Sequence, residues 1–349
     1  MSTGDWSCPV AKYSSDTITM SHGAGGRLSA QLFDEVFAKN YPSPELMAKG
    51  DSAVLDWTAK DRLAVCTDAF VVQPLLFPGG DIGKLSVYGT VNDLAVQGAE
   101  PVALTTAWIL EEGFPIAELA KLANSVGQAA AECSIRVVAG DTKVVERGRA
   151  HGCYIATTGI GRLGPSVNLS PQAIRSGDCV LISGPIGDHG MAIMSQRSGL
   201  QFDPPLLSDS APLHRMTLEL VAKVPGLRCM RDPTRGGIVA SLNELAAACG
   251  LCFEIQEASV PVRPQVHSAC ELLGLDPWIV ANEGKLLAIV PPDEVELALE
   301  ILRSHSIGSL GAKIGTVHNL YKGLVIARTL YGTHRIVPMP AGELLPRIC

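Results

Sequence analysis

No stretch of eighteen consecutive apolar residues occurs in this 349-residue sequence, so its pattern predicts no membrane-spanning helix. Residues 1–21 lack the basic start and the apolar stretch of a signal peptide. There is also no block of lysine and arginine, and the formal net charge is -7. These absences argue against a nucleic-acid groove or an anionic membrane surface as the main partner, and we expect a cytoplasmic protein.

The sequence also lacks the cysteine spacing of a disulfide framework or a zinc site. Its ten cysteines are scattered, which is typical of reduced thiols in a cytosol. The single Cys249-Gly250-Leu251-Cys252 motif has no second ligand pair, so we interpret it as structural, with Gly250 ending a helix. No tandem repeat is visible. The length and the 47% hydrophobic content predict two domains with a large buried core.

Alternating apolar patterns predict an α/β fold. Strands are expected at 102–109 and 135–139, on either side of an amphipathic helix at 116–132. A segment rich in Gly, Pro, Ser and Asn at 161–171 is typical of a domain boundary. The predicted division is a polar leader at 1–16, an N-terminal α/β domain at 17–163, a C-terminal α/β domain at 164–337 and a mobile tail at 338–349.

A glycine cluster, Ser21-His22-Gly23-Ala24-Gly25-Gly26, lies between a short strand pattern at 18–20 and helical spacing at 28–39. Glycines in such a position let backbone amides approach a phosphate, and a helix start adds its positive dipole end. The cluster matches neither the Walker pattern nor the dinucleotide fingerprint. A phosphate-binding turn and a plain tight turn are both open at this point.

Four aspartates lie at the ends or openings of predicted buried segments. Asp51 and Asp68 lie beside short apolar runs, the second at the carboxyl end of a strand, where ligands gather in α/β sheets. Asp93 lies in the middle of an apolar helix, and Asp141 follows the strand at 135–139. Each one could be a cap or turn residue. Together they are the hard oxygen ligands that hold magnesium against nucleotide phosphates, and they predict a magnesium-nucleotide site.

The second half of the sequence adds two loops of interest. Residues 231–237, Arg-Asp-Pro-Thr-Arg-Gly-Gly, precede a predicted helix at 238–248, a setting that suits anion or metal binding. Glu283 lies in a loop before a predicted strand at 286–290, where a glutamate is usually solvated. His189 lies at the start of another helix, where capping is a more common role than catalysis.

The sequence ends in Pro346-Arg347-Ile348-Cys349. From Pro338 onward it contains three prolines and a glycine and has no apolar period, so we expect a tail without helix or strand. Fully extended, its twelve residues span at most roughly 40 Å. The tail can therefore carry the Cys349 thiol into a distant pocket, where it would be an acceptor that needs an activated donor. An accidental surface cysteine is the other interpretation.

Taken in order, these motifs resemble the HypE family of hydrogenase maturation factors, carbamoyl dehydratases of the superfamily that includes aminoimidazole ribonucleotide synthetase and selenophosphate synthetase. The matching blocks are Ser-His-Gly-Ala-Gly-Gly at 21–26, Asp-Ser-Ala-Val at 51–54, Phe-Pro-Gly-Gly-Asp-Ile-Gly-Lys-Leu at 77–85, Val-Asn-Asp-Leu-Ala at 91–95, Gly-Asp-Thr-Lys-Val-Val at 140–145, Asp-Pro-Thr-Arg-Gly-Gly at 232–237 and the final Pro-Arg-Ile-Cys. Two departures are small: Ala69 replaces the usual serine, and the leader is longer.

This resemblance implies two α/β domains and a homodimer whose N-terminal domains pair their sheets into a barrel, with ATP and Mg²⁺ in the cleft. It implies that a carbamoyltransferase of the HypF type loads a carbamoyl group onto Cys349. ATP then phosphorylates the carbamoyl oxygen, and loss of phosphate leaves a thiocyanate. That group supplies the cyanide ligand for the iron of [NiFe] hydrogenase, held by a HypC-HypD complex.

The resemblance also assigns site residues. Besides Cys349, these are Asp51, Asp68, Asp93 and Asp232 for magnesium and phosphate, Gly25, Gly26, Asn92 and Asp141 for the nucleotide, Lys143 to steady developing negative charge, and Glu283 as the base. Lys143 could instead contact the triphosphate alone or lie as a solvated lysine at a strand end. Two other functions are open: a synthetase of the same superfamily that acts on a free small substrate, and a non-catalytic carrier or scaffold.

Overall fold

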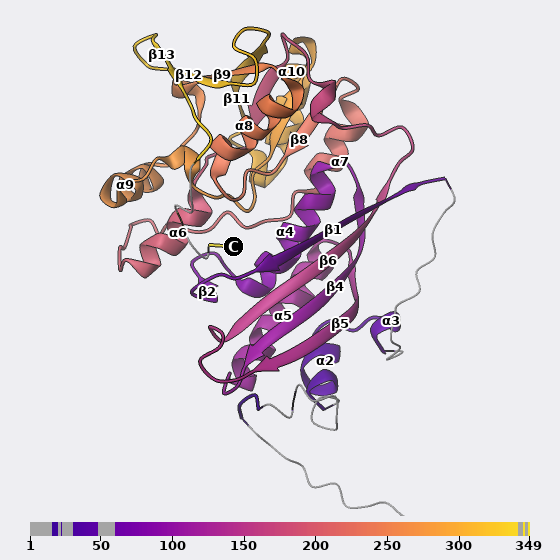
Figure 1. Ribbon diagram of the computed structural model, residues 1–349. Helices are drawn as coiled ribbons and strands as arrows, with labels where there is room; N and C mark the ends of the chain where they lie inside the picture. The colour runs from indigo at the N-terminus through magenta and orange to yellow at the C-terminus, as the bar shows by residue number, and fades with distance from the viewer. Residues whose placement is uncertain (1–15, 20–21, 23–30, 48–59, 341–344, 346–347) are drawn as a thin grey trace, which may run out of the picture.

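The structure is a computed structural model that describes residues 16–19, 22, 31–47, 60–340, 345, 348 and 349. Two α/β parts lie one above the other, and the last residue of the chain lies between them (Figure 1). We call residues 60–163 the first part and residues 164–340 the second part. Their large sheets share no strand. On that ground we propose the division of the chain at 163/164.

Four strands form the sheet of the first part, in the spatial order β1, β6, β4, β5. Their bounds are β1 Arg62–Phe70, β4 Glu100–Glu111, β5 Arg136–Val145 and β6 Cys153–Leu163. Only β4 and β5 are parallel. Helices α4 (Ile82–Val96) and α5 (Ile116–Glu132) cover one face, and the other face is uncovered by any helix in the described part of the chain (Figure 1). Within one chain this sheet is open and does not close into a barrel.

Helix α4 is the central helix of the molecule. Its residues are small or apolar on nearly every side because it lies between the sheet and the second part. Asp81 caps its start: the carboxylate accepts hydrogen bonds from the Lys84 backbone N–H at 3.0 Å and from the Ser125 hydroxyl at 2.8 Å. Helix α5 has the bounds that the apolar spacing predicts.

Strand β5 does not end where the sequence pattern predicts. We expected a strand at 135–139 followed by a loop, but β5 continues to Val145 because β4 runs parallel beside it. Asp141 and Lys143 therefore lie within a strand, paired in register with Ala107 and Ile109 of β4.

Seven strands form the sheet of the second part, in the order β13, β12, β9, β11, β7, β10, β8. Their bounds are β7 Cys179–Ile182, β8 Cys229–Arg231, β9 Cys252–Gln256, β10 Leu287–Val290, β11 Ala312–His318, β12 Val325–Arg328 and β13 His334–Ile336. The helices are α6 Asp188–Arg197, α7 His214–Lys223, α8 Gly237–Cys249, α9 Pro264–Leu273 and α10 Val295–Ser304. Helices α7 and α10 share one apolar core with this sheet, and α8 shares another.

Shorter elements complete the fold. They are η2 Phe33–Phe37, α2 Ala38–Asn40, α3 Pro44–Met47, the pair β2 Leu76–Phe77 and β3 Gly80–Asp81, and the turns η3 Pro171–Ala173, η4 Glu257–Ser259, η5 Pro277–Ile279, η6 Pro292–Glu294 and η7 Ser306–Gly308. The described tail residues include no helix or strand, as predicted. Gly250, with a φ of 70°, ends α8 as predicted, and the nine cysteines of the described residues are free thiols. No helix among those residues has the length and apolarity to cross a membrane.

Candidate active site

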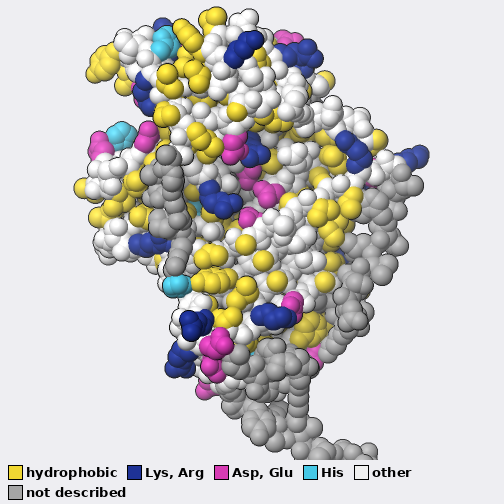
Figure 2. All heavy atoms as spheres, in the orientation of Figure 1, with side chains coloured by type: hydrophobic (Ala, Val, Ile, Leu, Met, Phe, Trp, Pro, Cys, Tyr) yellow, Lys and Arg dark blue, Asp and Glu magenta, His cyan; other side chains and the backbone are white. Residues whose placement is uncertain are grey.

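A cavity of about 400 Å³ lies where the two parts of the chain meet. Figure 2 shows acidic and basic side chains gathered near the middle of this face, between the two parts. The lining comes from β1, α4, the loop before α8, the loop before β10 and the last residue of the chain. The residues that matter for its chemistry are Asp68, Asp93, Asp232, Arg235, Glu283 and Cys349. Segments far apart in the sequence thus form one polar hollow.

Three of the four aspartates predicted to bind magnesium line this cavity. Asp68 lies near the carboxyl end of β1, and Asp93 lies in the fourth turn of α4. Asp232 follows β8 in the loop that leads into α8. The fourth, Asp51, lies outside the described residues, as do Gly25 and Gly26.

The charges of Asp68 and Asp232 raise the affinity of Asp93 for protons, and the charge of Asp68 raises that of Asp232. Burial, followed by the charges of Asp232 and Asp68, raises the pKa of Asp93 to about 7. Burial also raises the pKa of Asp232 to about 6 and that of Asp68 above its ordinary value. Partly buried carboxylates that repel one another are stabilised by a cation placed between them. Their carboxylate oxygens are donors of the type that Mg²⁺ prefers.

No group of three or more His, Cys, Asp or Glu side chains in the described residues is gathered closely enough to hold a metal ion by itself. Mg²⁺ is usually held by one or two carboxylates together with substrate phosphates and water, so a site of that kind does not require such a group.

Cys349 lies against Glu283 in this cavity. Both residues line the cavity, with the Cys349 thiol facing the Glu283 carboxyl. Burial, followed by the charge of Glu283, raises the pKa of the Cys349 thiol well above its ordinary value. Burial and the charges of Asp232 and Asp209 likewise raise the pKa of Glu283. Glu283 is only 3% exposed, which differs from the solvated loop glutamate that its sequence context indicated.

Asp209 holds the backbone around Glu283 in place. Its carboxylate accepts a hydrogen bond from the Glu283 backbone N–H at 3.2 Å and forms an ion pair with Lys285 at 2.9 Å, with both side chains buried. Gly284 lies between Glu283 and Lys285 in the sequence. It packs so closely that an added Cβ would lie 1.9 Å from the Asp209 carbonyl oxygen. Asp209 therefore fixes Glu283 beside Cys349. Its sequence context, a short polar loop, gave no signal of this role.

Asn92 does not line the cavity. Its side chain is 2% exposed, and its amide is bonded to the backbone of the second part. The amide nitrogen donates to the carbonyl oxygens of Ala211 at 3.1 Å and Glu283 at 3.3 Å, and the amide oxygen accepts from the Leu213 N–H at 2.8 Å. These contacts join α4 to the loop that carries Glu283.

Asp141 and Lys143 also lie away from the cavity. They form an ion pair at 2.6 Å on β5, with side chains 63% and 65% exposed. The hydrogen bond from Lys143 lowers the pKa of Asp141. Their register partners on β4 place them on the uncovered face of the first sheet. Within one chain, Lys143 is therefore not gathered with Glu283 and Cys349.

Several cavity residues are absent from the sequence-based assignment, among them Arg235 and Cys66. Arg235 comes from the Asp-Pro-Thr-Arg-Gly-Gly loop, and its charge opposes the rise in the pKa values of Asp68 and Cys349. Cys66 lies on β1 with its thiol 3.3 Å from the Thr90 carbonyl oxygen, and burial raises its pKa to about 12. The loop motif could have indicated Arg235, whereas nothing in the sequence distinguishes Cys66 from the other cysteines.

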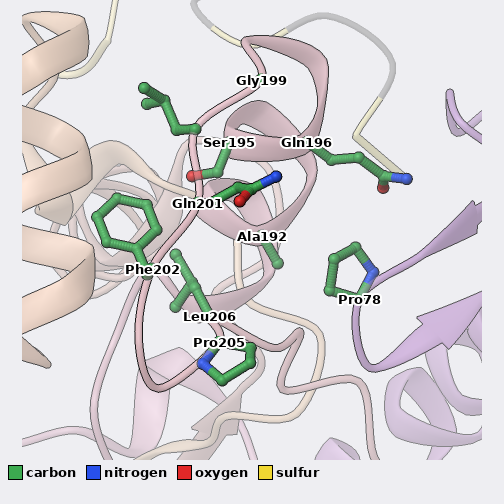
Figure 3. Close-up of a pocket in the computed structure, with 10 residues that line it drawn as sticks. Pro78, Ala192, Ser195, Gln196, Gly199, Gln201, Phe202, Pro205 and Leu206 are labelled. Atoms are coloured by element: carbon green, nitrogen blue, oxygen red, sulfur yellow. The ribbon is translucent and has the colours of Figure 1, made fainter.

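A second cavity, of about 420 Å³, lies between Pro78 and the end of α6 (Figure 3). Its lining is formed by apolar side chains such as Phe202 and Leu206 and by neutral polar ones such as Gln201. It has no ionisable side chain and none of the residues assigned from the sequence. This second cavity therefore offers no acid, base or cation for the chemistry expected from the sequence.

His189 is neither solvated nor a helix cap, the roles that its sequence context favoured. It is fully buried, and its Nε2 lies 2.9 Å from the backbone carbonyl oxygen of Ile348. Ile348 is itself 3% exposed and belongs to the core of the first part. The residue before Cys349 is therefore anchored.

Comparison with known proteins shows which family the chain resembles over both of its parts. The family model described as AIR synthase related protein, N-terminal domain, matches residues 49–163, and its C-terminal counterpart matches residues 175–323. The carbamoyl dehydratase HypE of Cupriavidus necator is 47% identical over 335 residues, which cover 96% of this chain and 95% of that protein. The two sequences are thus alike over nearly their whole length.

Two solved structures are similar to this one. The crystal structure of a hydrogenase maturation protein HypE in complex with ATP superposes with a TM-score of 0.91 at 43% identity, covering 95% of this chain and 99% of that one. The crystal structure of a HypE-HypF complex superposes with a TM-score of 0.77 at 46% identity, covering 88% of this chain and 99% of that one.

Proposed function

Because this chain belongs to the HypE family of hydrogenase maturation proteins, it is an ATP-dependent carbamoyl dehydratase, and we propose that the carbamoyl group on which it acts is carried by its own Cys349. One observation carries the proposal: Cys349 lies beside Glu283 in a cavity that three aspartates also line. A thioester-like carbamoyl group at that sulfur would lie beside a carboxylate and close to the place where a magnesium-bound phosphate fits.

The proposed reaction has three steps. A carbamoyltransferase of the HypF type first forms the S–C(O)NH₂ group on Cys349. The carbamoyl oxygen then attacks the terminal phosphorus of ATP, which releases ADP and one nitrogen-bound proton. Loss of the second nitrogen-bound proton and cleavage of the C–O bond finally release phosphate and leave S–C≡N. Phosphorylation is required because an amide oxygen is a poor leaving group.

Glu283 is the proposed base for the nitrogen-bound protons. A base works best when its pKa lies near the working pH, and the burial of Glu283 moves its pKa in that direction. Arg235 is one of the two arginines that line the cavity, with Arg231, and it would stabilise charge on the departing phosphate. Asp68, Asp93 and Asp232 would hold Mg²⁺, together with Asp51. Bound there, Mg²⁺ would neutralise phosphate charge.

Intact mass spectrometry tests this proposal. After incubation with the carbamoyltransferase, carbamoyl donor and ATP, the wild-type chain is expected to gain a carbamoyl group and then lose the mass of one water. Cys349→Ala should gain nothing and should release no phosphate from ATP in response to loading. Cys66→Ala removes the other thiol of the same cavity and should behave as wild type.

The same experiment separates the alternatives. Phosphate release by Cys349→Ala with a free amide or selenide would identify a synthetase that acts on a free small substrate. A loaded wild-type chain that releases no phosphate and keeps its carbamoyl mass would identify a carrier or scaffold. Either result would overturn the assignment of Cys349 as the site of dehydration.

We also propose a homodimer formed through the uncovered face of the first sheet. Leu63 and Val65 on β1 are 56% and 60% exposed, and Ile109 on β4 is 38% exposed. Val65 pairs in register with Ile160 of β6, so the apolar residues of neighbouring strands lie on one face. An exposed apolar sheet face favours association. Two such sheets packed face to face could close the barrel that the family resemblance implies.

Sedimentation velocity tests the dimer. Val65→Glu places a charge in the proposed interface and should yield monomers. Leu330→Glu is the matched control, since Leu330 is 73% exposed in the second part and lies outside that face. A second copy on this face would also cover Asp141 and Lys143. We therefore propose that their roles toward the nucleotide and toward the developing charge depend on the dimer.

Three further proposals follow from the same site. The docked position of Cys349 would hide its thiol from a carbamoyltransferase, so we propose that the tail moves out for loading. The product thiocyanate would then pass to an iron-carrying HypC-HypD complex. The nine free thiols of the described residues favour a reducing compartment, the cytoplasm.

A further inference from the structure

The hydrogen bond between His189 and the tail fixes the state of the imidazole ring. The carbonyl oxygen of Ile348 can only accept, so His189 Nε2, 2.9 Å away, must be the donor. The other ring nitrogen, Nδ1, lies 2.8 Å from the Ser208 hydroxyl oxygen. Burial lowers the pKa of His189, which favours the neutral ring. In a neutral ring with its hydrogen on Nε2, Nδ1 accepts a hydrogen bond, and the Ser208 hydroxyl donates it.

Ser208 is oriented by its own neighbours. Its hydroxyl oxygen accepts a hydrogen bond from the Ser210 backbone N–H at 3.1 Å, so its hydrogen is available for His189. Its backbone N–H donates to the Pro78 carbonyl oxygen at 2.8 Å, which ties the loop to the first part of the chain. The hydrogen bonds therefore run in one direction, from Ser210 through Ser208 and His189 to Ile348.

The ring itself is held by packing. The Phe77 ring meets it edge-on, with centroids 5.5 Å apart. Gly187, the residue before α6, has a φ of +87°, and a Cβ there would lie 2.8 Å from a methyl group of Val266. The start of α6 is thus fixed between β2 and α9, and His189 is 0% exposed. A donor held this rigidly selects one position of the carbonyl that it contacts.

We propose that His189 is a positioning residue for the dehydration: by holding the carbonyl of Ile348 it sets the fraction of time that Cys349 spends beside Glu283. His189 touches no reacting atom. Its hydrogen bond and the burial of Ile348 stabilise the docked tail, whereas loading requires the undocked tail. The role of His189 in dehydration rests on the proposed function. Docking of the tail does not, because it can be measured without carbamoyl donor or ATP.

The test is the rate at which Cys349 reacts with a maleimide in the full-length chain. His189→Leu replaces the ring by an apolar side chain of similar bulk and removes the donor, whereas His189→Gln keeps an N–H near the position of Nε2. Loss of one buried hydrogen bond is expected to raise the labelling rate of Cys349 about tenfold in His189→Leu. His189→Gln should return most of the way to wild type. Digestion and mass spectrometry resolve Cys349 from Cys249, the internal reference.

Three outcomes are decisive. Selective acceleration at Cys349 in His189→Leu, with recovery in His189→Gln and a smaller acceleration in Ser208→Ala, supports the proposal. An unchanged Cys349 rate in His189→Leu overturns it. Equal acceleration at Cys349 and Cys249, or acceleration in His189→Gln as large as in His189→Leu, shows that loosened packing and not the donor is responsible, and also overturns it.

These outcomes do not depend on whether the chain dehydrates a carbamoyl group. If labelling supports the docking role but loaded wild-type chain never loses a water, the proposed function fails and the docking role stands. If loading and dehydration proceed but labelling is insensitive to His189, only the positioning role fails.

Discussion

Replacing Asn92 by alanine should weaken the contact between α4 and the backbone of the second part. The truncation leaves the Leu213 N–H and the Ala211 carbonyl without their partner, while the Glu283 carbonyl keeps its bond from the Ala211 N–H. Each buried group left unpaired costs about 1–3 kcal/mol, so we expect a loss of about 4 kcal/mol in the free energy of unfolding. For a chain of this length that lowers the unfolding temperature by roughly 5 °C.

Asn92→Asp should be worse than Asn92→Ala. It keeps the shape of the side chain but points a carboxylate oxygen at two carbonyl oxygens, and buried acceptors that face one another repel. In both variants the Glu283 carbonyl keeps only its bond from the Ala211 N–H and is held less firmly, so the rate at which the carbamoyl group loses water should fall in each. Loading of Cys349 by the carbamoyltransferase should be unaffected, because the tail is proposed to be undocked in that step.

Thermal unfolding followed by circular dichroism is the assay, combined with intact mass spectrometry of the loaded chain. Asn124→Ala is the matched control: Asn124 is exposed on α5, and its loss should change the free energy of unfolding by less than about 0.5 kcal/mol. The reasoning is refuted if Asn92→Ala keeps the wild-type unfolding temperature and weakens only the binding of ATP. In that case Asn92 serves the nucleotide, as its sequence motif indicates.

Three further predictions address the cavity and its support. Glu283→Gln should be loaded normally on Cys349 but should lose water about a hundredfold or more slowly in single-turnover mass measurements; a wild-type rate would exclude Glu283 as the base. Asp93→Asn relieves the repulsion among three carboxylates, so it should raise the unfolding temperature without ligand and reduce the additional stabilisation by Mg²⁺ with ATP; an undiminished stabilisation would remove Asp93 from the magnesium site. Burial alone would raise the pKa of Asp209, but the charge of Lys285 and the hydrogen bonds from Lys285 and the Glu283 N–H lower it more, to below its ordinary 3.8, so its ionised form stabilises the fold above that pH and this contribution is lost as the pH falls through the lowered value. Asp209→Asn should therefore lower the free energy of unfolding by about 3 kcal/mol at pH 7 and by progressively less in strong acid. A loss that urea titrations show to be independent of pH would contradict this.

Local patterns in the sequence were sufficient for most elements. The apolar spacing of 116–132 predicts α5 because the periodicity of a helix that packs on one face is written in its own residues. Gly250 likewise ends α8 for a local reason, its left-handed backbone. The predicted end of β5 was wrong. A strand continues as long as its neighbour offers hydrogen bonds, and the length of β4 is not encoded in the residues of β5.

For the candidate site, the sequence indicated the participants better than their contacts. Asp68, Asp93 and Asp232 were chosen by motif, and the structure gathers them in one cavity with Glu283 and Cys349. The role assigned to each by the family resemblance stays a prediction.

Residue types and their order along the chain determined the α/β character of this protein, its family and a tail that ends in a thiol. Only the tertiary structure decided that Asn92 binds backbone, that Asp209 holds Glu283 and that His189 anchors Ile348. The physical reason is that these side chains are buried, and a buried polar group must find its partners wherever the folded chain places them. Those partners lie about 70 to 190 residues away in the sequence, beyond the range of any local pattern.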